Sequence, residues 1–297
     1  MRWAVVGATG LIGRRLCRHL AAAGHDVAAV SRAGTPVDGA AVAVRWDPAA
    51  GGLDPAGVAD RDVVVNLAGA GIGDARWTDG RKREIVESRR AATRGIVEAL
   101  RADGAPRVLV SASAVGFYGT GERECTEATP PGDDFLAATC GAWEREALAA
   151  RAHGVRVVLT RFGIVLDAHG GALAKQLTPF RLGFGGPLGG GRQWVSWVHI
   201  DDAVRLIERA GADPSIEGPV NVVAPRPVRQ REFARALGAA LHRPALVPTP
   251  GAALRLTMGE MATLALHGQR VTPAVALAAG FGYLHPDVDE ALRDLLR

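Results

Sequence analysis

The sequence predicts an α/β protein, a Rossmann-type doubly wound parallel sheet with a smaller C-terminal substrate or lid domain. Three features predict this fold. Short β-branched runs alternate with longer amphipathic segments up to residue 166, and a glycine-rich turn follows the first run. The chain then changes to a block rich in glycine and tryptophan. Such alternation is typical of the strands and crossover helices of a parallel sheet.

The predicted strands are short apolar runs in which valine predominates, as expected of strands buried on both faces. In chain order they are 3–7, 26–32, 41–47, 62–69, 107–113 and 155–166. The segment 218–225 is expected to return a last strand to the same sheet.

The predicted helices fill the spaces between these strands, at 11–24, 80–104, 141–154 and 199–211. The first is expected to close at Gly24, and Asp201 or Asp202 is expected to cap the last. The block 183–202 is interpreted as a loop or short-strand insertion, and helices dominate again from about Val228.

These elements divide the chain into two domains. Residues 1–166, completed by about 199–224, are expected to form the Rossmann domain. Residues 167–198 and 225–297 are expected to form a substrate or lid region and a small C-terminal domain.

Composition narrows the class of protein. The net charge of +4 is small for 297 residues, and the arginines are dispersed among acids, as in RKREIVESRR. This pattern does not favour nucleic acid as a partner. No C-x-x-C spacing occurs among Cys17, Cys125 and Cys140, so we expect neither disulfides nor a metal, and a cytoplasmic location.

No apolar run approaches the roughly 18 residues of a membrane helix, and no secretory signal is recognisable. We therefore expect no membrane partner, and nothing in the sequence indicates the oligomeric state.

The strongest motif is VVGATGLIGRRL, in which glycines 7, 10 and 13 stand between a predicted strand and a predicted helix. Glycine allows a tight turn and a close backbone approach to a pyrophosphate, which the free N–H groups of the helix start would bind. The alternative is an ordinary tight turn. We expect a dinucleotide here, with contacts from Gly7, Thr9, Gly10, Leu11, Ile12 and Gly13.

The end of the second strand indicates which dinucleotide binds. An acid there would accept from the 2′-hydroxyl of NAD, whereas arginine suits the 2′-phosphate of NADP. Here Ser31 replaces the acid and Arg32 follows it, which favours NADP(H) over the alternative of a surface arginine.

Two further segments are candidates for the same site. Asp47 could accept from the adenine amino group, or it could cap a turn before Pro48. The segment NLAGAG (66–71) ends the fourth strand with small residues such as Gly69, which would let the backbone pass close to the cofactor, or would simply pack a strand end closely.

Taken together, GATGLIG, NLAG, VSAS and VHIDD resemble the extended short-chain dehydrogenases/reductases of the epimerase/dehydratase type. The segments CGAWE, GGALAKQLTPFRLGFGGPLGGGRQWVSWVHIDD and GQRVTPAVALAAGF resemble one subgroup, the YfcH-type epimerase-family proteins with a C-terminal domain of unknown function. The resemblance implies an NADP-binding Rossmann domain and a cofactor site that also includes Leu67, Ala68, Glu84, Arg89 and Val165.

The same resemblance shows that two catalytic residues of the superfamily are missing from this sequence. The superfamily uses a tyrosine as general acid or base, with a lysine four residues later that lowers its pKa. Phe135 and Thr139 stand at the expected positions. The chain's two tyrosines, Tyr118 and Tyr283, are followed four residues later by acids, so no Tyr-x-x-x-Lys exists in the sequence.

Several residues are candidates for the remaining chemistry. Ser113, with Ser111 as runner-up, matches the serine that polarises the substrate oxygen. Tyr118 is the first candidate for the proton donor, although tyrosines in such loops usually serve packing. Weaker alternatives are Cys140, Lys175, His199 and Asp202, each of which has a simpler structural interpretation.

The block from Gly170 to Trp197 is expected to face a small-molecule substrate, with Arg181, Gln193 and Trp194 as candidate contacts. The alternative is that its aromatics only pack the two domains together. The sequence thus predicts an NADP(H)-dependent oxidoreductase that transfers hydride to or from a carbonyl or alcohol carbon. The competing interpretation is a non-catalytic NADP(H)-binding sensor or ligand-binding protein.

Overall fold

Seven parallel strands form the main sheet of the computed structural model, which describes residues 1–51, 53, 58, 60–101 and 107–297. Their order is β11-β7-β5-β4-β1-β2-β3, so the direction of winding reverses between β1 and β4. The bounds are β1 Arg2–Val6, β2 Asp26–Ser31, β3 Val42–Arg45, β4 Val63–Asn66, β5 Val108–Ala114, β7 Arg156–Phe162 and β11 Gly218–Val222. The predicted fold class is confirmed.

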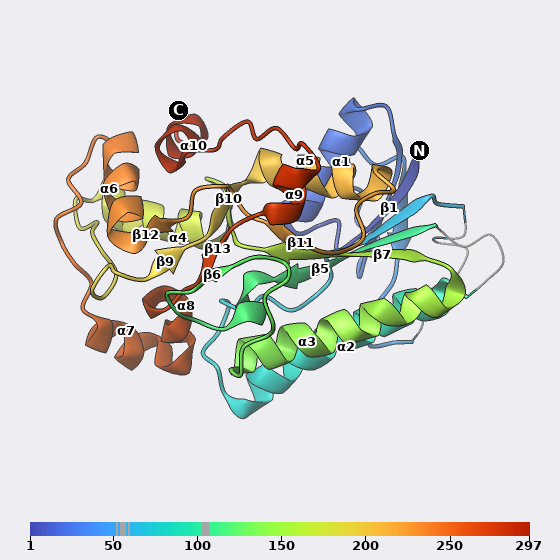
Figure 1. The fold of residues 1–297 in the computed structure, drawn as a ribbon, viewed down its shortest axis with the longest axis horizontal. Coiled ribbons are helices and arrows are strands. Elements are labelled where there is room, and N and C mark those ends of the chain that lie inside the picture. The colour runs from blue at the N-terminus through green and yellow to red at the C-terminus, as the bar shows by residue number, and fades with distance from the viewer. Residues whose placement is uncertain (52, 54–57, 59, 102–106) are drawn as a thin grey trace.

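Helices cover both faces of this sheet (Figure 1). On one face lie α1 (Leu11–Ala22) and α5 (Ile200–Ala212), and on the other lie α2 (Asp79–Ala99) and α3 (Phe135–Leu148). Two separate apolar cores result, one around Trp3 and Leu16 and the other around Ile96 and Leu109. The sheet is therefore a three-layer scaffold whose loops at the carboxyl ends of the strands are left to build a site.

The predicted strand 155–166 is in fact two strands. Main-sheet strand β7 ends at Phe162, and β8 (Ile164–Leu166) pairs instead with β10 (Trp197–His199). Gly163 makes the break possible, because a β-carbon there would lie 2.5 Å from the carbonyl oxygen of Ser196. The chain thus leaves the main sheet at this glycine and begins a second one.

Two helix starts also differ from the prediction. The helix expected at 141–154 begins at Phe135, because Asp134 caps it by accepting from the N–H of Ala137 at 2.8 Å. It ends in a 3-10 turn, η3 (Ala149–His153). The N-cap of α5 is His199 and neither predicted aspartate. The predicted end of α2, 102–104, lies outside the described residues.

A second, smaller region packs beside the carboxyl ends of the main sheet (Figure 1). The sequence interpretation missed its helix α4 (Gly171–Arg181), whose flanking glycines and internal Pro179 resemble a loop. Leu173, Leu177 and Phe180 of α4 share a third apolar core with helices α6 (Gln230–Ala240) and α10 (Val288–Leu295).

The remaining elements of this region are short. They are the 3-10 turn η4 (Gly259–Ala262), strands β6 (Glu124–Cys125), β9 (Trp194–Val195), β12 (Val228–Arg229) and β13 (Arg270–Val271), and helices α7 (Gly251–Met258) and α8 (Thr263–Leu266). The 3-10 turn η2 (Val115–Tyr118) packs on α3 instead, and helix α9 (Ala274–Ala278) packs on β11. Among the described residues, no helix has the length and apolar character needed to cross a membrane.

Candidate functional site

A hollow of about 550 Å³ lies at the carboxyl ends of β1, β2 and β4, where the winding of the sheet reverses. This is the position at which open α/β sheets bind ligands. Its walls include the predicted residues Gly7, Thr9, Gly10, Ser31, Arg32, Asp47, Leu67, Ala68, Gly69 and Glu84. The sequence interpretation missed other wall residues, notably Trp46 and Ser88, for which no motif exists.

The glycine-rich turn is packed so closely that side chains have no room. A β-carbon on Gly7, whose φ is +82°, would lie 2.9 Å from the carbonyl carbon of Leu67. One on Gly13 would lie 2.4 Å from the carbonyl oxygen of Gly7. Gly10 caps α1 with extended backbone and without a side-chain bond. The start of α1 therefore forms a cradle with free N–H groups that fits a pyrophosphate.

The end of β2 places an exposed cation beside this cradle. The buried hydroxyl of Ser31 accepts from the N–H of Thr35 at 3.2 Å. Arg32 is exposed on the wall, and it has no hydrogen bond or ion pair within the part of the chain that is described. The carboxylate of Asp47 accepts from the N–H of Ala49 at 3.1 Å, which is the turn contact that the sequence allowed. Asp47 also lies on the wall of the hollow, and its contact with adenine remains a prediction.

The wall formed by β4 is fixed from beneath by Asn66. Its buried side-chain oxygen accepts from the N–H of Ala68 at 3.1 Å, and its amide nitrogen donates to Thr93 at 2.9 Å. The N–H of Ala70 donates to the hydroxyl of Ser88 at 3.1 Å. The backbone of 67–70 is thereby held against α2 without large side chains.

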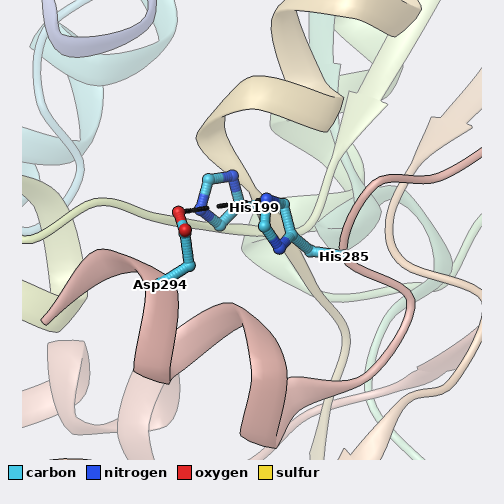
Figure 2. Close-up of side chains that lie close together, drawn as sticks. All are labelled: His199, His285 and Asp294. Carbon is cyan, nitrogen blue, oxygen red and sulfur yellow. Dashed lines mark ion pairs between the residues drawn. The ribbon is translucent and has the colours of Figure 1, made fainter. Parts of the chain in front are cut away.

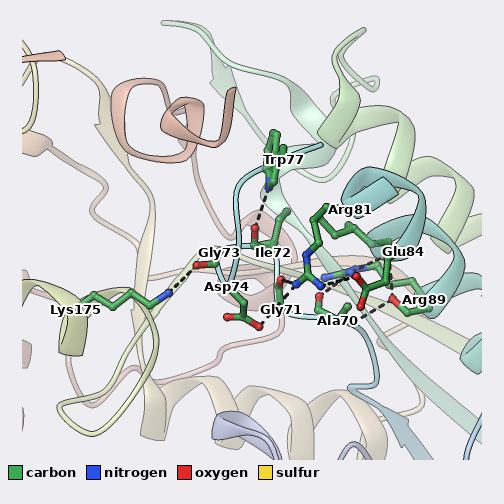
Figure 3. A network of polar contacts seen from close by, with 12 residues as sticks. Ala70, Gly71, Ile72, Gly73, Asp74, Trp77, Arg81, Glu84, Arg89 and Lys175 are labelled. Atoms are coloured by element: carbon green, nitrogen blue, oxygen red, sulfur yellow. Dashed lines mark hydrogen bonds and ion pairs between the residues drawn. The ribbon is translucent and has the colours of Figure 1, made fainter. Parts of the chain in front are cut away.

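Glu84 and Arg89 of α2 have different environments, although the resemblance assigns both to the cofactor (Figure 3). Glu84 is exposed and pairs with Arg81 at 2.7 Å. Arg89 lies under the loop and donates to the carbonyls of Ala70 and Ile85 at 3.0 and 2.9 Å. Burial lowers the pKa of the Arg89 guanidinium. Arg89 thus supports the wall of the hollow from behind.

Five predicted cofactor residues do not line the hollow, namely Leu11, Ile12, Gly13, Arg89 and Val165. Leu11 contacts the start of α4, where a β-carbon on Gly170 would lie 2.6 Å from its Cδ1. Ile12 packs against the main core, and Val165 on β8 is partly buried against the same core. Leu11 therefore marks where the glycine turn meets the second region. The amine of Lys175 on α4 reaches the opposite loop and donates to the carbonyl of Gly73 at 2.7 Å (Figure 3).

The predicted chemical residues lie in a closed, buried network. Ser113, near the end of β5, donates to Oε1 of Glu144 at 2.6 Å. Both oxygens of Glu144 accept from Arg161 at 2.8 Å. The hydroxyl of Tyr118 accepts from Arg161 at 3.0 Å and donates to Asn221 at 2.6 Å. All five side chains are less than 9% exposed.

This network leaves little capacity for proton transfer. Burial raises the pKa of Tyr118 to about 12, although the neighbouring Arg161 opposes the shift. The proton of Ser113 is directed at Glu144 and not at an open space. In this arrangement neither hydroxyl is free to donate to a substrate oxygen, so their catalytic roles remain predictions.

Phe135 and Thr139, at the positions expected for the tyrosine and lysine, do not face Ser113, whereas the next residue, Cys140, does. Thr139 donates to the carbonyl of Phe135 at 2.7 Å, and the Phe135 ring packs edge-on against Trp77 at 5.2 Å. The thiol next to the hydroxyl of Ser113 belongs to Cys140, and burial, followed by the charge of Glu144, raises the pKa of that thiol to about 11. The missing tyrosine and lysine are therefore not replaced by an acidic thiol.

The predicted substrate residues do not converge. Gln193 donates to the carbonyls of Leu188 and Ala265 at 3.1 and 2.6 Å. Trp194 donates to Glu122 at 3.0 Å and lies under the guanidinium of Arg229 at 3.7 Å. Arg181 is exposed at the end of α4. None of the three lies on the wall of the hollow, so their substrate roles also remain predictions.

A parallel sheet that reverses its winding at a glycine cradle, with the hollow at that point, defines a Rossmann-type dinucleotide-binding protein. Comparison with protein families makes this specific. Residues 3–223 match the NAD dependent epimerase/dehydratase family, and residues 249–295 match a domain of unknown function, DUF1731. The chain belongs to this epimerase/dehydratase family and carries the C-terminal domain that the sequence resemblance indicated.

Relatives match the whole chain. The epimerase family protein SDR39U1 homolog, chloroplastic, of Arabidopsis thaliana is 41% identical over 312 residues, covering 100% of this chain and 87% of its own. YfhF of Bacillus subtilis is 37% identical and is covered to 98%. The crystal structure of human SDR39U1 (isoform 2) with NADPH has a TM-score of 0.90 at 36% identity, covering 100% of this chain and 99% of that one.

Proposed function

We propose that this protein binds NADP(H) in the hollow and is an NADP(H)-dependent oxidoreductase acting on a carbonyl or alcohol substrate. The observation that carries the proposal is the exposed Arg32 guanidinium on the wall of the hollow, which no other described residue pairs with, beside a glycine cradle without room for side chains. A guanidinium suits a 2′-phosphate, and no acid stands at the end of β2 to favour a free ribose hydroxyl. The human relative crystallised with NADPH supports the same cofactor.

When bound, the nicotinamide gives or accepts the hydride. The protein has to position the nicotinamide beside the substrate carbon and to give a proton to, or take one from, the substrate oxygen. Ser113 is the proposed group for polarising the substrate oxygen. It would have to turn its hydroxyl from Glu144, to which it donates at 2.6 Å, toward the substrate. Tyr118 would have to leave Asn221 and Arg161 in the same way. The proton step is therefore the demanding part of this function.

A second function has a specific observation in its favour. Both hydroxyls that could serve the chemistry are satisfied inside the buried network, and the Tyr-x-x-x-Lys pair is absent. A protein that binds NADP(H) and responds to its redox state without turnover would need no proton donor. A cytoplasmic location is part of the proposal for either function.

One experiment separates the two functions. The protein is loaded with NADPH, and a panel of carbonyl compounds is screened for loss of the nicotinamide absorbance. Turnover that Ser113→Ala abolishes and the exposed control Ser215→Ala preserves would establish the oxidoreductase. Loss in Ser111→Ala instead would move the role to the runner-up. NADPH binding without oxidation across the panel would favour the binding protein.

A further inference from the structure

Three titratable side chains meet where the C-terminal segment packs onto the start of α5 (Figure 2). The rings of His199 and His285 are stacked, with centroids 3.9 Å apart and an interplanar angle of 30°. Oδ2 of Asp294, on α10, lies 3.4 Å from Nε2 of His199 and 3.9 Å from Nε2 of His285. The cluster is separate from both the hollow and the Ser113 network.

His199 is the unusual member, because it is only 1% exposed and its Nε2 has no hydrogen-bond partner among the described residues. Its Nδ1 accepts from the backbone N–H of Asp201 at 3.1 Å and so caps α5. A backbone N–H can only donate, so Nδ1 must carry a lone pair. In the neutral ring the proton is therefore on Nε2, which lies 3.4 Å from Oδ2 of Asp294 without forming a hydrogen bond to it.

This proton position argues against a metal ion, although two histidines and an aspartate within 4.8 Å could otherwise hold one. A metal at Nε2 needs the lone pair of that nitrogen, while the other ring nitrogen normally donates to an acceptor. Here Nδ1 faces a donor instead. The in-plane lone pairs of stacked rings also lie in two separate planes, which does not favour their convergence on one ion.

A second proton on His199 would be destabilising for a geometric reason. It would have to sit on Nδ1, directly against the N–H of Asp201, and would break the cap. It would also place a cation 3.9 Å from the ring of His285. Burial, followed by the neighbouring His285, lowers the pKa of His199.

Acidic groups around the His199 ring only partly offset the lowering of its pKa. Asp294 is partly exposed to solvent, with 42% of its side chain accessible, and Asp201 is paired with Arg15. Asp202 is buried, where it accepts from the N–H groups of Leu284 and His285 at 2.8 and 2.9 Å and pairs with Arg205 at 3.0 Å. Asp202 thus ties the segment carrying His285 to α5 through contacts that do not involve the His199 ring.

We propose that His199, His285 and Asp294 form an acid-sensitive latch, which holds α10 and the segment before it on the start of α5 and releases them as the pH falls below neutrality. The docked state requires a neutral His199, whereas the released ring takes up a proton near its ordinary pKa of about 6.5. Docking is therefore complete above that pH and weakens as the pH falls through and below it.

Release of α10 from α5 would also affect helix α4 and the glycine turn. Ala291 and Leu292 of α10 share an apolar core with Leu173 and Leu177 of α4. The start of α4 at Gly170 rests on Leu11 of the glycine turn. A loosened α10 would thus weaken the support of the segment that lies against the cradle. The latch itself rests on local contacts and does not depend on the proposed function.

Hydrogen exchange of the full chain measures the latch directly. We expect the opening of the 288–295 amides, corrected for intrinsic exchange, to increase about tenfold between pH 7.5 and 5.5. In His199→Asn, which keeps an N-cap acceptor but cannot titrate, the increase should stay below about twofold. His285→Phe keeps a stacked ring and should give an intermediate increase. His19→Asn, in a separate pair with Glu208, should behave as the wild type.

Two results would overturn the latch. One is an increase in amide opening below about twofold in the wild type, and the other is an increase as large as that of the wild type in both His199→Asn and His285→Phe. If His199→Asn does not fold, an unchanged tenfold increase in His285→Phe alone contradicts it. Zinc ions are added alone at pH 7.5 as a further arm. Strong protection of α10 by zinc that His285→Phe abolishes would identify a metal centre instead of a latch.

Discussion

The proposed adenosine end and the proposed chemistry end of the cofactor site differ in whether their polar groups have partners within the protein. At the adenosine end, the cradle is open, its glycines leave backbone groups uncovered, and Arg32 has no partner among the described residues. At the chemistry end, Ser113, Tyr118, Glu144 and Arg161 satisfy one another in a buried network. Free polar groups indicate a ligand, whereas satisfied ones indicate structure, so binding is better supported than turnover.

This comparison predicts where substitutions will act. Changes at the open end should alter cofactor binding and leave stability nearly unchanged. Changes at the closed end should alter stability first.

The largest expected effect comes from Glu144→Ala, which would leave the Arg161 guanidinium buried without its carboxylate partner. We expect a loss of about 3–5 kcal/mol in the free energy of unfolding. The matched control is Glu146→Ala on the same helix, whose partners Arg90 and Arg94 are more exposed and which should cost less than about 1 kcal/mol. Urea denaturation measures both, and equal losses would contradict the idea of a closed structural network.

The open end was predictable from the sequence because its information is local. The glycines of the cradle stand three residues apart in one short motif, and Arg32 directly follows its strand. The buried network at the closed end could not be predicted from the sequence, because Ser113 and Arg161 meet only through the pairing of β5 with β7. A signal was present in VRVVLTRF, where Arg161 interrupts an apolar strand and so requires a buried partner.

Local sequence signals were also wrong at particular points. The helix α4 was hidden by its glycines and Pro179, and the cap of α5 is a histidine where aspartates follow immediately. In both cases tertiary packing decided the outcome. Leu173 and Phe180 bury one face of α4, and His199 is held by the stacked His285.

A smaller effect is expected from Arg32→Ala at the open end. Losing a charge-assisted contact to the 2′-phosphate should weaken NADPH binding by about 1.5–3 kcal/mol, roughly 10- to 150-fold, and leave NADH binding nearly unchanged. Arg45→Ala is the control, because this arginine is exposed on β3 opposite Ser31 but does not line the hollow. Titration with both cofactors measures the preference, and an unchanged NADPH/NADH ratio would remove Arg32 from the proposed phosphate contact.

The smallest expected effect on the cofactor comes from Tyr118→Phe at the closed end. The substitution removes the donor to Asn221 and the acceptor for Arg161, so stability should fall by about 1 kcal/mol. Because burial holds the pKa of Tyr118 near 12, the phenol stays protonated throughout the neutral range and its removal should not shift a pH–rate profile there. NADPH affinity, and turnover of any substrate found in the screen, should change by less than about threefold, roughly 0.7 kcal/mol. Turnover lost at unchanged stability would instead make Tyr118 the proton donor, and the closed end would then have to open during the reaction.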